Sequence, residues 1–124
     1  MLITQDQIKG LPCGTISATR EEVEEIMPEV LPVIDSCPAD SENYRYDVKV
    51  HMLMPGQWPC IPGWHRDFVP RDEENRLRPE RIQDSAPPMF LWVSGHPVTE
   101  FREGGLVEPR EWKQFSQRDE HRGR

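Results

Sequence analysis

Residues 44–54 have the sequence YRYDVKVHMLM. Over residues 46–54 apolar and polar side chains alternate, and the apolar set consists of Val48, Val50, Met52 and Met54. Because successive side chains of a β-strand point to opposite faces, this alternation is typical of a half-buried strand. We therefore predict a strand over residues 46–54 whose apolar set faces a core.

Two later segments also have the pattern of strands. MFLWVSG, residues 89–95, is a short and nearly continuous apolar run, which predicts a buried strand over 89–94. VTEFREG, residues 98–104, alternates in the same way as a strand, and we expect it to pair with the first around the turn at 95–97. The 13 prolines of the chain argue against a helical bundle, because each removes a backbone donor.

Helical patterns are fewer. SATREEVEEIMPEV, residues 17–30, has a Ser/Thr start, glutamates in its first turn and apolar residues at helical spacing, which predicts an amphipathic helix over 19–30. EPREWKQF, residues 108–115, predicts a short second helix. Residues 70–88 are charged and interrupted by prolines, so we expect an exposed excursion there.

Length and composition limit the classes of protein. A chain of 124 residues fits one domain over 1–124. Its net charge of −7 argues against direct nucleic-acid binding, which needs basic side chains on the phosphates. Three cysteines without C-x-x-C spacing indicate reduced thiols, and no run approaches the roughly 20 apolar residues of a membrane helix. We expect a cytoplasmic protein that does not enter a membrane.

The sequence WPCIPGWHRDF, residues 58–68, contains a candidate metal-binding pair. His65 and Asp67 are two positions apart, so on an extended backbone both side chains point the same way and can reach one ion. With a second imidazole they would form a 2-His-1-carboxylate triad, which leaves positions open on Fe(II). The candidates for that imidazole are His96 and His121.

Two other interpretations of the same residues exist. A His-Arg-Asp sequence in a loop is most often a surface turn with a local ion pair, and a short motif is only a hypothesis. The catalytic loop of protein kinases also contains H-R-D, but it requires Asn five positions after the Asp, where this chain has Asp72.

Taken together, WHRDF at 64–68 and EHRGR at 120–124 resemble the Fe(II)/2-oxoglutarate-dependent oxygenases. The resemblance covers roughly residues 46–124. It implies a mainly β fold, a double-stranded β-helix or jelly roll, with the helix at 19–30 outside it. It also implies that His65, Asp67 and His121 are the catalytic metal ligands, with Fe(II) and 2-oxoglutarate as cofactors and a small molecule or a protein as the hydroxylated substrate.

The sequence departs from this family at its C-terminal end. The family places a basic residue about a strand's length beyond the distal histidine to bind the far carboxylate of 2-oxoglutarate, whereas this sequence ends at Arg124. Arg122 and Arg124 offer the fork-shaped guanidinium that suits a carboxylate, although they stand close to His121. We therefore expect a jelly roll that is incomplete at its C-terminus.

A second class of function is also open. On the same fold, a non-catalytic module such as an inhibitor or adaptor would use the acidic surface and the excursion at 70–88 to bind a protein partner.

Overall fold

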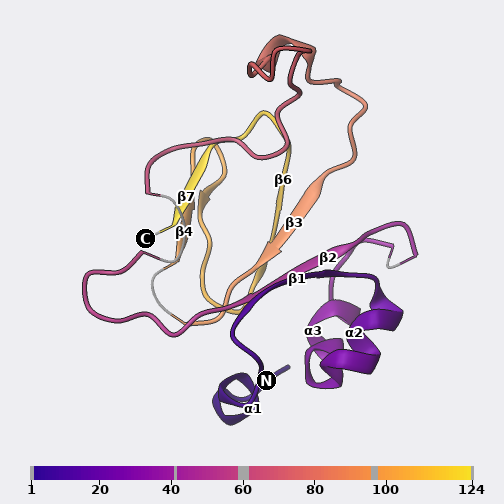
Figure 1. Ribbon diagram of the computed structural model, residues 1–124, viewed down its shortest axis with the longest axis vertical. Coiled ribbons are helices and arrows are strands. Elements are labelled where there is room, and N and C mark those ends of the chain that lie inside the picture. Colours follow the sequence, from indigo (N-terminus) through magenta and orange to yellow (C-terminus); the bar gives the residue numbers. More distant parts are fainter. Residues whose placement is uncertain (1, 41, 59–61, 96–97, 124) are drawn as a thin grey trace. The chain divides into compact units, whose positions relative to one another are not determined.

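The computed structural model describes residues 2–40, 42–58, 62–95 and 98–123. They form two compact units, Met1–Met54 and Pro55–Arg124 (Figure 1). Most of the regular structure consists of strands in small antiparallel sheets, and the helices are few and short. Among the described residues no helix is both long and apolar enough to cross a membrane. The single domain over 1–124 stays a prediction.

The first unit combines a two-stranded sheet with short helices. Its elements are α1 (Gln5–Lys9), β1 (Gly14–Ala18), α2 (Arg20–Ile26), the 3₁₀ helix η1 (Pro28–Val30), α3 (Leu31–Asp35) and β2 (Tyr46–Val50). β1 and β2 pair antiparallel, and α2 and α3 lie together beside them (Figure 1). The buried apolar side chains of this unit are Ile3, Ala18, Val23, Met27, Val30, Val33, Ile34 and Tyr46.

The helix predicted over 19–30 is shorter than expected. It begins as predicted, because the Thr19 side chain accepts a hydrogen bond from the backbone N–H of Glu22. It ends at Ile26, since Pro28 cannot donate to the helix and disfavours helical geometry at Met27, whose φ is −146° and ψ 68°. The chain then continues as η1 and α3.

The strand predicted over 46–54 is also shorter. β2 ends at Val50 because its partner β1 starts at Gly14, directly opposite that residue. Met52 and Met54 lie beyond the last β1–β2 pair, and they are 83% and 66% exposed. The prediction that these two methionines face a core is wrong.

The second unit contains two small sheets. Its elements are the 3₁₀ helix η2 (Pro79–Arg81), β3 (Met89–Trp92), β4 (Thr99–Phe101), β5 (Gly105–Leu106), β6 (Trp112–Phe115) and β7 (His121–Gly123). β3 pairs with β6 (Figure 1). β4 lies between β5 and β7. Phe101, Val107 and Phe115 form the core of this unit, with Met89 and Leu91 packed against them.

The pairing corrects two predictions. β3 and β4 are strands as predicted, but they do not pair with each other, and part of the turn expected between them lies outside the described residues. The helix predicted over 108–115 is wrong, because Trp112–Phe115 is β6 and pairs with β3 over its whole length. Long-range pairing here overrides a weak local helical preference. The small sheets do not confirm a double-stranded β-helix.

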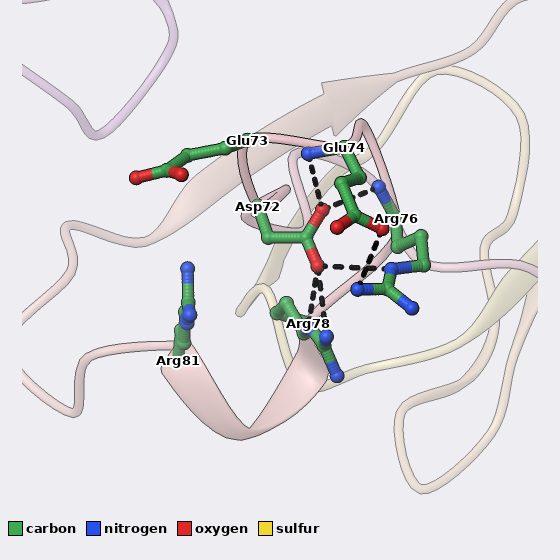
Figure 2. A pocket seen from close by; sticks show the side chains of 6 residues that line it. All are labelled: Asp72, Glu73, Glu74, Arg76, Arg78 and Arg81. Carbon is green, nitrogen blue, oxygen red and sulfur yellow. Dashed lines mark hydrogen bonds and ion pairs between the residues drawn. The ribbon is translucent and has the colours of Figure 1, made fainter.

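The excursion at 70–88 is more structured than its composition suggests (Figure 2). The Asp72 carboxylate accepts hydrogen bonds from the backbone N–H groups of Glu74 and Arg76, and the Arg76 and Arg78 guanidinium groups also donate to it. The Asp72 side chain is only 10% exposed, although most of its charged neighbours are exposed as predicted. The hollow around it is lined by Asp72, Glu73, Glu74, Arg76, Arg78 and Arg81.

We predict that Asp72→Asn loosens this segment without unfolding the protein. The hydrogen bonds, first of all that from the Arg76 backbone, lower the pKa of Asp72, so the carboxylate is the form that the loop binds. Trypsin should then cut after the arginines of residues 71–81 faster in the variant, with the melting temperature nearly unchanged.

Glu73→Gln is the matched control, because Glu73 is exposed in the same segment. Since the pKa of Asp72 is lowered on folding, its contribution is complete above the ordinary aspartate pKa of about 3.9 and is lost as the pH falls through the lowered value. Equal cleavage rates in the Asp72 variant and the wild type would contradict the role of this carboxylate.

Candidate metal centre

The site begins with a backbone contact between two histidines. His65 forms an isolated antiparallel bridge with His121, the first residue of β7. The N–H of His65 donates to the carbonyl of His121 at 3.0 Å, and the N–H of His121 donates back at 2.8 Å. Because residues directly opposite in an antiparallel pair share a face, both imidazoles lie on the same side, with ring centroids 4.3 Å apart.

Asp67 completes the group. Its Oδ2 lies 3.0 Å from Nε2 of His121, and its Oδ1 lies 3.5 Å from Nε2 of His65. One ligand atom from each of the three residues lies within 4.8 Å of the others. Phe68, which follows Asp67, has a φ of 53°, a left-handed conformation uncommon for a residue other than glycine. The extended segment that carries both ligands therefore ends directly after Asp67.

The three ligands differ in how firmly they are held. His121 is 8% exposed, and its ring packs on Phe101 and Phe115 with centroid distances of 5.4 Å to each. The side chains of His65 and Asp67 remain 36% and 40% exposed. One ligand is thus fixed by the aromatic core, while the other two leave the site open to solvent.

The charge of the site suits a cation. A hydrogen bond from His121 lowers the pKa of Asp67, electrostatic interaction with both histidines lowers it further, and partial burial opposes them. The carboxylate is therefore ionised at neutral pH. At pH values above the ordinary aspartate pKa, the Asp67–His121 hydrogen bond contributes to the stability of the fold. This contribution is lost as the pH falls through the lowered pKa of Asp67.

These donors fit a divalent transition metal. Two imidazole nitrogens and one carboxylate oxygen are ligands that such ions accept, and three protein ligands leave further positions open. One feature is incomplete: Nδ1 of His121 is buried and has no hydrogen-bond partner among the described residues. A histidine that binds a metal usually donates its other ring N–H to a carboxylate, carbonyl or water.

The structure brings together His65, Asp67 and His121 from the predicted site, but it does not bring Arg122 to them. Arg122 follows His121 in β7, so its side chain leaves the opposite face of the strand. Its guanidinium pairs with Glu100 at 2.8 Å. Arg124 and His96 lie outside the described residues, and His51 is an exposed residue of the first unit.

Sequence reasoning missed the aromatic support of His121. Phe115 was expected in a helix, whereas it ends β6 and contacts both Phe101 and the His121 ring. No local signal in residues 108–115 names the strand partner, because β3 lies about twenty positions away in the sequence.

We predict that His121→Leu leaves the fold as stable as the wild type or more stable. Leucine removes an unpartnered buried nitrogen, which costs about 1–3 kcal/mol, and presents an apolar side chain to Phe101 and Phe115. Asp67 loses a hydrogen bond but is exposed enough for water to replace it. Urea unfolding measures the effect on the free energy of unfolding.

His65→Leu is the control, because this half-exposed imidazole has no such buried nitrogen, and its replacement should bring no gain in stability. A decrease of more than about 2 kcal/mol for His121→Leu, typical of a lost buried interaction, would show that the imidazole is well satisfied in the fold.

Comparison of the chain with protein-family models, with curated proteins and with solved structures finds no match. The resemblance to the oxygenases rests on residues of this chain: the His65 and Asp67 pair and the distal His121, which meet at one site.

Proposed function

We propose that the chain binds Fe(II) through His65, Asp67 and His121 and is an oxygenase-like protein. The observation that carries the proposal is the convergence of two imidazoles and one carboxylate, from segments far apart in the sequence, within 4.8 Å of one another. When bound in such a triad, Fe(II) supplies the activation of dioxygen for oxidation of a C–H bond.

The three residues would have separate roles at this site. His121 is packed against the core and sets the position of one nitrogen ligand. His65 is held opposite by the backbone bridge and supplies the second nitrogen. Asp67 supplies the negative charge that offsets part of the charge of a divalent ion. The exposure of His65 and Asp67 leaves room for a substrate to approach.

2-Oxoglutarate belongs to the proposal through the family resemblance, as the co-substrate. Its far carboxylate calls for a guanidinium near the metal. Arg122, the predicted clamp among the described residues, instead pairs with Glu100 on the other face of β7. The described residues therefore fit the metal and do not supply the clamp for 2-oxoglutarate. We expect metal binding to be the stronger of the two activities.

The second candidate function is a protein-binding module without catalysis. The observation that favours it is the uneven charge: residues 1–54 contain ten acidic and four basic residues. Glutamates of α2 are exposed, as Glu21, Glu22, Glu24 and Glu25 all face solvent. Such a surface attracts a basic partner at long range. This candidate gains support if the protein takes up no metal.

We predict that the purified protein binds Fe(II) without oxygen and that His65→Ala and Asp67→Ala each abolish binding. Both residues are partly exposed ligands, so their removal should leave the fold intact. Anaerobic titration followed by metal analysis measures uptake. Addition of 2-oxoglutarate then tests for the visible charge-transfer band of the ternary complex.

His51→Ala is the control for this series, because His51 is exposed and belongs to the first unit. It should bind iron as the wild type does. Unchanged uptake in the His65 or Asp67 variant, or no uptake by the wild type, would rule out this metal centre. Iron binding without the charge-transfer band would keep the metal centre and reject 2-oxoglutarate.

A further inference from the structure

The face of the sheet opposite the metal ligands has an ordered set of side chains. The bridge sets Trp64 opposite Arg122 and Arg66 opposite Glu120, since these residues flank His65 and His121. Glu100 of β4 lies opposite Arg122, and Arg102, which follows β4, lies opposite Glu120. These six side chains form two rows, which we call the outer lattice. One row is Trp64, Arg122 and Glu100, and the other is Arg66, Glu120 and Arg102.

Ion pairs fix the charged members of the outer lattice. Arg122 pairs with Glu100 at 2.8 Å, as described above. Glu120 accepts from Arg102 at 3.1 Å and from Arg66 at 3.5 Å. An exposed ion pair contributes little to stability by itself, but ion pairs that share a residue restrict the motion of the same side chains.

Trp64 is the aromatic member of the lattice. The guanidinium carbon of Arg102 lies 4.4 Å from the centroid of the Trp64 ring, and that of Arg122 lies 4.6 Å from it. Two cations thus contact one indole, the aromatic ring with the strongest attraction for cations. Both arginines belong to the β4–β7 part of the sheet, whereas Trp64 belongs to the segment that carries His65 and Asp67.

Side-chain contacts join that segment to β7 and to Glu120 just before it, among them the Asp67–His121 hydrogen bond and the Arg66–Glu120 ion pair. Among the described residues, backbone hydrogen bonds join residues 62–68 to β7 only at the His65–His121 bridge. A strand with a single bridge can shift or separate, because no further ladder bonds set its register. The contacts of Trp64 act next to this bridge, one residue before His65.

We propose that Trp64 is a positioning residue that holds His65 against His121 through its contacts with Arg102 and Arg122. Its effect on metal affinity rests on the proposed function of the site. Trp64 lies on the face opposite the metal ligands, and its role is to fix the backbone that carries two of the three. Loss of the indole should leave all three ligands in the protein but make the distances between them variable.

Two measurements on full-length Trp64→Ala test this inference. Amide hydrogen exchange at His121, whose N–H donates to His65, should be faster in the variant with or without metal. Affinity for Co(II), used as an oxygen-stable probe, should fall roughly tenfold, as for other residues that orient metal ligands. Trp64→Phe keeps an aromatic face and should restore most of both values.

The control is Trp58→Ala, which makes the same chemical change at an exposed tryptophan outside the outer lattice. It should change neither measurement. Arg122→Gln removes one of the two cations and should show a smaller effect of the same kind, whereas a residue that only bound 2-oxoglutarate would leave Co(II) affinity unchanged.

Wild-type exchange at His121 in Trp64→Ala would overturn the inference, whatever the metal affinity. If the wild type binds no Co(II) or Fe(II), the proposed function fails, and faster exchange at His121 in the variant still supports the positioning role. The two failures are therefore distinguishable. Equal effects of Trp58→Ala would also overturn the inference, since they would reflect general loss of stability.

Discussion

Two backbone hydrogen bonds between His65 and His121 are the constraint on which the rest of this site depends. They set two segments side by side that are far apart in the sequence, and the alternation of side chains then assigns every neighbour to a face. On one face stand the two imidazoles with Asp67. On the other stands the outer lattice around Trp64. Because a shift by one residue would exchange the faces, the register that groups His65, Asp67 and His121 also forms the outer lattice.

The second unit supports this bridge unequally. β7 is held by its pairing with β4 and by the packing of the His121 ring on Phe101 and Phe115. The segment with His65 lies beside β7 at a single bridge and keeps partial exposure. A rigid ligand is thus combined with accessible ones. Such a division suits a site that must hold an ion in place while it admits a second molecule.

The sequence predicted the grouping of His65, Asp67 and His121 better than it predicted the fold around them. Because side chains alternate between the two faces of an extended chain, the sequence was enough to predict that His65 and Asp67 share a face. The family resemblance selected His121 as the third residue. The same alternation separates Arg122 from the ligands, because it follows His121 directly. Strand partners were not predictable, since the pairing of β3 with β6 depends on contacts across the unit and not on local composition. The early end of α2 had a visible cause in Pro28, whereas the end of β2 depended on where β1 begins.

The unpartnered nitrogen of His121 has a consequence for how a metal would be exchanged. The hydrogen bond to Asp67 assigns the ring proton to Nε2 in the free protein. A metal bound at Nε2 requires the other tautomer, with the proton on Nδ1, where the described residues offer it no acceptor. Metal binding would therefore replace a hydrogen-bonded N–H group at Nε2 of His121 with an N–H group at Nδ1 that lacks an acceptor among the described residues. In the proposed metal centre this unsatisfied group would weaken binding, so the ion would exchange readily with the metal supply around it.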